Sequence, residues 1–144
     1  MKILILIFIS FIYLSCSKPN YIGNGESQVE NISTRCEYVF KDEQLCLETN
    51  WETLPSESEY GSMLLTFTDQ DDPTRIISPK HDPHIVLWMP SMGHGSSPVT
   101  LTLIQDGVYR ASEIFFIMPG PWEIRFQLKD GSRIVEEVIQ KITI

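Results

Sequence analysis

From residue 45 to residue 144, apolar and polar side chains alternate, and this period of two constrains the fold more than any other feature. A β-strand turns successive side chains to opposite faces, so the alternation indicates strands with one buried face. No apolar stripe recurs at helical spacing over three turns. The pattern, or a short apolar run, occupies residues 45–51, 63–68, 84–89, 98–105, 108–117, 122–128 and 134–144.

Turn signals separate these segments. Asp106-Gly107 and Asp130-Gly131 predict tight turns, because glycine accepts a positive φ without steric cost. Segment 69–83 has no strand pattern and either carries function or links two sheets. About seven short strands in about a hundred residues indicate an all-β chain folded as an immunoglobulin-like antiparallel β-sandwich, with an open barrel as the alternative.

The beginning of the chain predicts export and a lipid anchor. Lys2 precedes an almost purely apolar run, residues 3–14, that is too short to cross a bilayer and indicates a cleaved signal peptide. Ser15-Cys16 then resembles the bacterial lipoprotein box, in which the cysteine is acylated, although Tyr13 stands where leucine is usual. We expect a signal peptide over 1–15 and a lipid on Cys16. Secretion with a free Cys16 is the alternative.

The rest of the chain divides into a tether and one domain. Residues 16–35 are rich in Ser, Asn, Gly and Glu and predict a flexible tether, whereas 36–144 has the usual length of one domain. In an oxidising compartment, Cys36 and Cys46 are expected to form a disulfide. Metal-binding thiolates are the less favoured alternative, because the two cysteines lack CxxC spacing.

The charge of the chain argues against two classes of partner. The net charge is −8, and removal of residues 1–15 takes away one lysine and no acid, so the mature chain would carry −9. This balance argues against nucleic acids and anionic lipid surfaces as partners.

Two segments, 88–98 and 115–122, carry the chemistry of interest. They contain Met89, Met92, His94 and Met118 beside glycines that allow tight turns. Thioether sulfur and imidazole nitrogen suit copper, above all Cu(I). The alternative is structural, because methionine also fills gaps against aromatic rings in cores.

Strand parity predicts that these segments meet. If strand 84–89 runs toward one end of the sandwich, strand 98–105 runs back and strand 108–117 returns, so Met92, His94 and Met118 lie at the same end. Met89 either joins them or points into the core. His84 begins the strand that Met89 ends, about 16 Å away, so neither it nor His81 is expected at this site.

The ordered motifs 88–95 (WMPSMGHG), 107–109 (GVY) and 116–124 (FIMPGPWEI) resemble the YtkA-like domain family, which is related to the FixH proteins. The resemblance covers about residues 45–144. It implies a small extracytoplasmic immunoglobulin-like domain with a copper role, and FixH-type members are associated with copper delivery to haem-copper oxidases. It favours Met92, His94 and Met118 as ligands.

Two hypotheses follow. The first is a lipoprotein of the bacterial cell envelope that faces the periplasm, binds copper and passes it to or from an envelope protein. Ser17 after the anchor cysteine favours the outer membrane. The second is an interaction module without metal. An enzyme is not expected, because the sequence has no nucleophile motif, phosphate loop or HExxH zinc motif.

Overall fold

The alternating segments form antiparallel strands in a computed structural model that describes residues 36–56 and 59–144. Contacts divide the chain after Ile32, and the unit Ser33–Ile144 contains every described strand and its own hydrophobic core, so it can be studied as a fragment. Nine strands occur in the described part: β1 (Tyr38–Phe40), β2 (Leu45–Thr53), β3 (Gly61–Asp69), β4 (Asp82–Met89), β5 (His94–Gly95), β6 (Thr100–Gln105), β7 (Val108–Ile114), β8 (Pro121–Asp130) and β9 (Arg133–Thr143).

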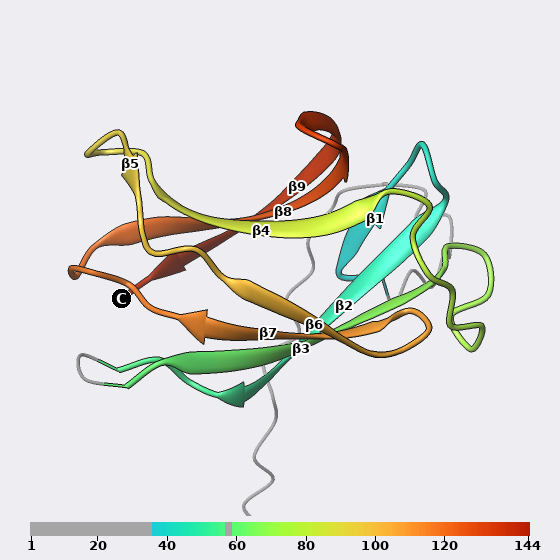
Figure 1. Cartoon of the computed structure of the whole chain (residues 1–144), viewed down its shortest axis with the longest axis horizontal. Helices are drawn as coiled ribbons and strands as arrows, with labels where there is room; N and C mark the ends of the chain where they lie inside the picture. The colour runs from blue at the N-terminus through green and yellow to red at the C-terminus, as the bar shows by residue number, and fades with distance from the viewer. Residues whose placement is uncertain (1–35, 57–58) are drawn as a thin grey trace, which may run out of the picture. The chain divides into compact units, whose positions relative to one another are not determined.

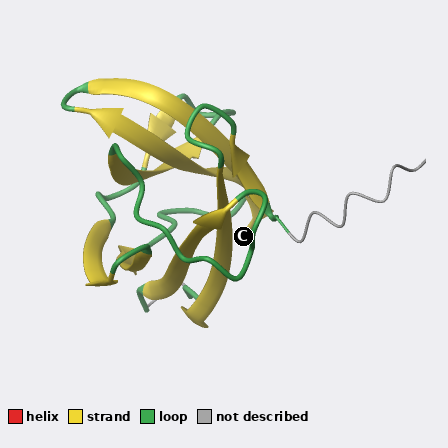
Figure 2. Cartoon of the chain, turned by 90° about the vertical axis from the view of Figure 1, so that its right-hand side faces the viewer, coloured by secondary structure: helices red, strands yellow, loops and turns green. Residues whose placement is uncertain are grey.

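The strands build two sheets. One has the order β1-β2-β3-β7-β6 and the other β5-β4-β8-β9, and all pairs are antiparallel. In Figure 1 the four-stranded sheet lies above the five-stranded one, and Figure 2 shows only strands and loops in the described part. The predicted all-β sandwich is confirmed.

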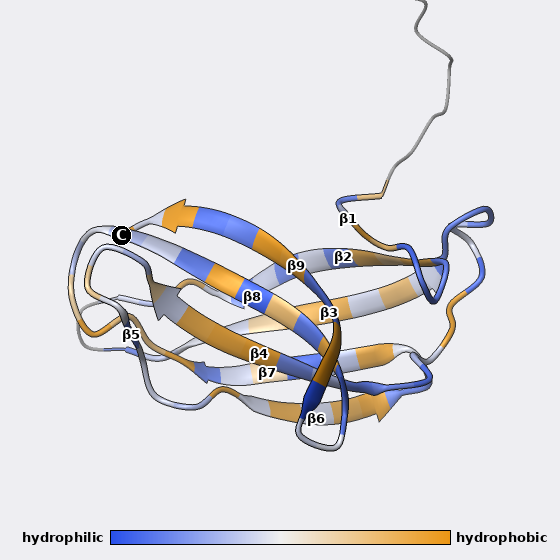
Figure 3. Ribbon diagram, turned by 90° about the horizontal axis from the view of Figure 1, so that it is seen from above, coloured by the Kyte–Doolittle hydropathy of each residue, from blue (hydrophilic) through white to orange (hydrophobic). Residues whose placement is uncertain are grey.

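Alternate residues of both sheets fill the space between them. In β8, Trp122, Ile124 and Phe126 are at most 2 % exposed, whereas Glu123 and Arg125 face outward. The corresponding hydrophobic and hydrophilic bands can be followed along β8 in Figure 3. The core therefore follows the period of two seen in the sequence.

Six of the seven predicted strands have bounds within two residues of the prediction, and β7 ends three residues early. The strand expected over 108–117 ends at Ile114, next to Glu113, whose positive φ of 61° bends the backbone out of the extended region. The two short strands β1 and β5 carry too few residues to show a pattern. Segment 69–83 is largely a connection, with one isolated bridge between Thr68 and Ile76.

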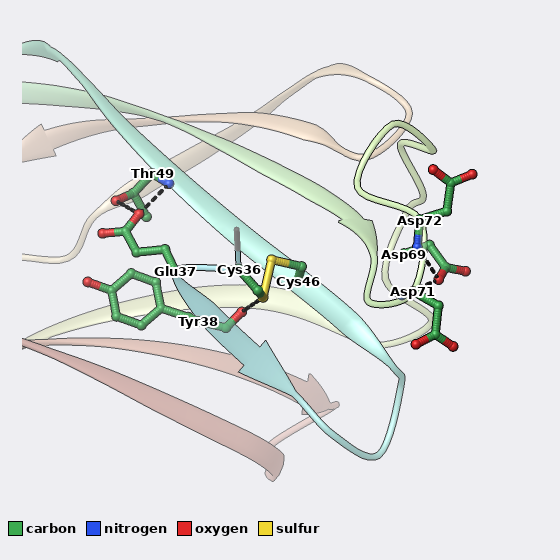
Figure 4. Close-up of a disulfide and its surroundings, with 8 residues drawn as sticks. All are labelled: Cys36, Glu37, Tyr38, Cys46, Thr49, Asp69, Asp71 and Asp72. Atoms are coloured by element: carbon green, nitrogen blue, oxygen red, sulfur yellow. Dashed lines mark hydrogen bonds between the residues drawn. A yellow bond between two sulfur atoms is a disulfide. The ribbon is translucent and has the colours of Figure 1, made fainter. Parts of the chain in front are cut away.

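Both predicted tight turns are present, with Gly107 at φ 73° and Gly131 at φ 60°. The predicted disulfide is also present. Cys36 and Cys46 are joined with their Cα atoms 5.3 Å apart, and the bond ties the start of the domain to β2 (Figure 4). The Sγ of Cys36 lies 3.1 Å from the carbonyl oxygen of Tyr38, a contact without a hydrogen bond because a disulfide sulfur has no proton to donate.

The predicted signal peptide, the lipid anchor at Cys16 and the tether lie outside the described residues. Among residues 36–56 and 59–144, no helix is long and apolar enough to cross a membrane.

Candidate functional site

A tight turn after β4 reverses the chain, so that β5 pairs antiparallel with the end of β4. The backbone N–H groups of Met92 and Gly93 both donate to the carbonyl of Met89, at 3.2 and 3.0 Å, and Gly93 has a positive φ of 65°. Glycine adopts that φ without strain. His94 is thereby brought into register opposite Met89 as the first residue of β5.

The loop between β7 and β8, residues 115–120, is held from three directions. The hydroxyl of Ser96 donates to the carbonyl of Phe115, and the indole N–H of Trp122 donates to the carbonyl of Met118 at 3.0 Å. Gly120 exchanges two backbone hydrogen bonds of 3.0 Å with Ile144. The loop is thus held by the residue after β5, by β8 and by the residue after β9.

The turn 90–93 and the loop 115–120 lie at the same end of the sandwich, at the left in Figure 1. Gly120 passes so close to Met89 that a Cβ on Gly120 would lie 2.8 Å from the Met89 Cε. The ring of His94 lies edge-on to that of Trp122, with centroids 6.3 Å apart. The structure therefore brings the two methionine-bearing segments together.

The four candidate residues differ in exposure. Met89 is 2 % exposed and belongs to the core, which is the second of the two positions expected for it. Met118 is partly buried and packs against the core, and His94 is half-buried. Met92 is 59 % exposed at the tip of the turn. At this end of the sandwich, the thioether of Met92 is exposed, the imidazole of His94 and the thioether of Met118 are half-buried, and Met89 is buried.

The imidazole of His94 has a backbone partner on one nitrogen. Its Nδ1 lies 3.1 Å from the carbonyl oxygen of Gly95. A carbonyl can only accept, so the tautomer that satisfies this contact carries its proton on Nδ1 and leaves the Nε2 lone pair free. A backbone carbonyl on the second nitrogen is also the usual arrangement of a metal-binding histidine.

The other two histidines lie elsewhere. The Nδ1 of His81 is 2.6 Å from a carboxylate oxygen of Glu43, and His84 is in register opposite Gln127, far along β4 from Met89. Burial, with a smaller effect of the Lys129 ammonium, lowers the pKa of His84. Neither side chain joins the candidate site.

Within the described residues, no group of three or more His, Cys, Asp or Glu side chains could hold a metal ion. His94 belongs to no such group.

Sequence reasoning did not identify three features of the site. These are the Ser96 hydroxyl that holds the loop 115–120, the close approach of Gly120 to Met89, and an apolar groove of about 560 Å³. Only Gly120, in a Pro-Gly-Pro motif, carried a local signal. The groove joins residues far apart in the chain: Pro55, Ser56, Phe115, Phe116, Ile117, Met118, Pro119 and Ile144.

A family model described as YtkA-like matches residues 55–127, just over half of the chain. The match includes both the turn 90–93 and the loop 115–120, and it leaves out the disulfide and β9. No curated protein and no solved structure matches the chain.

Proposed function

Because the chain belongs to the YtkA-like family, we propose that it is a membrane-anchored protein of the cell envelope that binds copper where the turn 90–93 meets the loop 115–120. The proposed ligands are Met92, His94 and Met118, and the proposed anchor is a lipid on Cys16. In this role the domain carries copper to or from an envelope partner, such as a haem-copper oxidase or a copper-resistance system. The proposal is one of binding and transfer without catalysis.

One observation carries the proposal: two separate segments bring thioethers and an imidazole to one end of the sandwich. The segments are linked by the contact of Gly120 with Met89 and by the packing of His94 on Trp122. Soft sulfur donors with one imidazole favour Cu(I) over the harder divalent ions.

The different exposures of the donors support a transfer role. Met92 is open to solvent, so an incoming protein could reach a metal from the side of this residue. His94 and Met118 are half-buried; the His94 ring contacts the Gly95 carbonyl, and the main chain of Met118 is held by the Trp122 indole. One exposed ligand beside two half-buried ones leaves a bound metal accessible to a partner from one side.

Met89 takes a different part in the proposal. Its thioether lies in the core against Gly120, and a ligand at that depth would require the loop 115–120 to move. We therefore do not include Met89 among the proposed ligands and use it as the control residue.

The test is a competition titration of Cu(I) against a chromophoric chelator, made on the fragment Ser33–Ile144. Ascorbate is the reductant, because it keeps copper as Cu(I) without reducing the disulfide. Reduction of the disulfide would release two thiols that bind copper themselves. One equivalent of copper is expected to bind. Met92→Leu, His94→Ala and Met118→Leu should each weaken binding by about tenfold or more, which is about 1.4 kcal/mol.

Met89→Leu is the matched control, because it removes a thioether of the same segment from the core. It should leave copper affinity unchanged within about threefold, since no donor is lost. Absence of Cu(I) binding by the folded wild-type fragment would overturn the proposal. Binding that is insensitive to His94→Ala and Met118→Leu would place copper at another site and would overturn it equally.

A further inference from the structure

The outer edge of β9 is the longest unpaired strand edge of the four-stranded sheet. β9 has 11 residues and pairs only with β8, and no strand among the described residues pairs with its other side. In Figure 3 it is the outermost strand of its own sheet, beside β8, and β1 of the other sheet lies near it. Such an edge presents a row of free backbone N–H and C=O groups and is a template for another strand.

Only the first part of this edge is covered. The carboxylate of Glu136 accepts hydrogen bonds from the backbone N–H groups of Lys41 and Asp42, in the turn between β1 and β2. From Glu137 to Thr143 no hydrogen bond from the turn between β1 and β2 reaches the strand in the described part, and the carboxylate of Glu137 accepts one from the side chain of Gln127 on β8. This open stretch contains neither proline nor glycine, the residues that commonly interrupt strand pairing.

The open stretch carries an exposed apolar residue between opposite charges. Glu137, Ile139 and Lys141 are in register with Gln127, Arg125 and Glu123 of β8, which alternate with the inward-facing Ile124 and Phe126, so they share the outer face of the sheet. Ile139 is 41 % exposed. An isoleucine flanked by an acid and a base at i−2 and i+2 is self-complementary under a two-fold axis.

We propose that two copies of this chain associate edge to edge through β9, antiparallel, with the two-fold axis at Ile139. Opposed residues of an antiparallel pair share a face, so this register sets Ile139 against Ile139 of the second copy. It also sets Glu137 against Lys141 of the second copy, twice by symmetry. The product is a continuous eight-stranded sheet.

Charge selects this register among the neighbouring ones. An axis at Glu137 would oppose two glutamates, and an axis at Lys141 would oppose two lysines, and like charges directly opposite are unfavourable. An axis at Val138 would set both charges against aliphatic side chains. Only the axis at Ile139 forms two ion pairs and one apolar contact.

An unsatisfied polar atom gives independent support. The Oε1 of Gln140 is buried and accepts no hydrogen bond from the described residues. A buried acceptor without a partner is costly. With the axis at Ile139, the two Gln140 side chains become diagonal neighbours on the inner face, about 7–8 Å apart at the backbone and within reach of one another. If both side chains rotate toward the shared edge, each amide can donate to the other's Oε1.

The test is sedimentation velocity on the fragment Ser33–Ile144 over a wide concentration range. We expect a concentration-dependent dimer. Lys141→Glu turns two attractive contacts into two repulsive ones and should raise the dissociation constant by about tenfold or more. The double variant Glu137→Lys/Lys141→Glu exchanges the charges, restores both pairs and should return the constant to within about threefold of wild type.

Lys80→Glu is the matched control, because it makes the same charge change on an exposed loop residue that is not part of β9 and should leave the dimer intact. Circular dichroism checks that each variant is folded, and the double variant tests the register even if Lys141→Glu alone is unstable. A wild-type fragment that stays monomeric at millimolar concentration overturns the proposal. So does a dimer that Lys141→Glu and Lys80→Glu weaken equally, or one that the charge exchange fails to restore. The inference does not depend on copper binding, and the assay contains no metal.

Discussion

Replacing Gly120 with alanine tests the packing on which the candidate site rests. Gly120 has φ 135°, a value that side chains of L-residues rarely adopt, and the new Cβ would lie 2.8 Å from the Met89 Cε. Two independent costs should therefore add: backbone strain at residue 120 and displacement of the buried thioether.

The size of the loss follows from these two contributions. Backbone strain at an unfavourable φ costs about 1–3 kcal/mol. Moving the end of a flexible Met89 side chain off its preferred rotamer costs about 1 kcal/mol. Alanine also lowers the conformational entropy of the unfolded chain, which stabilises the folded state by about 0.4–1 kcal/mol and offsets part of the loss. We expect a net loss of about 2–3 kcal/mol in the free energy of unfolding, or about 8–15 °C in Tm for a domain of this length.

The assay is urea unfolding of the fragment Ser33–Ile144, followed by tryptophan fluorescence. Gly93→Ala is the control, because Gly93 has φ 65° but nothing lies within 4 Å of its added Cβ, so only backbone strain of about 1 kcal/mol applies. Met89→Leu supplies a double-mutant cycle. Since leucine lacks the Cε, Gly120→Ala should cost about 1 kcal/mol less in that background.

Two results would refute the reasoning. If Gly120→Ala destabilises the fragment no more than Gly93→Ala, the close approach of the loop 115–120 to Met89 is wrong. If the cycle shows no coupling between residues 89 and 120, the two segments do not touch, and the proposed copper site loses its geometric support.

Two further predictions concern the disulfide and pH. Cys36 and Cys46 are 10 residues apart, and their disulfide reduces the conformational entropy of the unfolded chain. The double variant Cys36→Ser/Cys46→Ser removes this restriction and should lower the free energy of unfolding by about 2.7 kcal/mol. Unfolding of the oxidised wild type and the variant in urea measures the difference, and equal midpoints would contradict it. Burial, followed by the Lys129 charge, lowers the pKa of His84 in the folded state below 6.5, so the unfolded state binds more protons there. The contribution of His84 to stability should be complete above pH 6.5 and lost as the pH falls toward the folded-state pKa. His84→Gln should flatten that part of the stability curve, and an NMR titration midpoint above 6.5 would exclude the effect.

Much of the fold could be predicted because strand alternation is a local property. In β3, for example, Met63, Leu65 and Phe67 are inward-facing because each successive residue reverses the face, whatever lies opposite. The same counting predicted that the turn 90–93 and the loop 115–120 lie at one end. The tight turns at Gly107 and Gly131 follow from glycine's freedom at positive φ.

The details of the site required the tertiary structure. Met89 and Met92 stand three residues apart beside the same turn, yet one is 2 % and the other 59 % exposed. The difference arises because Gly120, 31 positions further along the chain, lies directly against Met89. Alternation and turn residues are local, so they were enough to predict the strands, the turns and the end at which soft donors gather. Which thioether is open to solvent and which edge of the sheet is free depends on the distant segments that pack against them, so neither could be predicted without the folded structure.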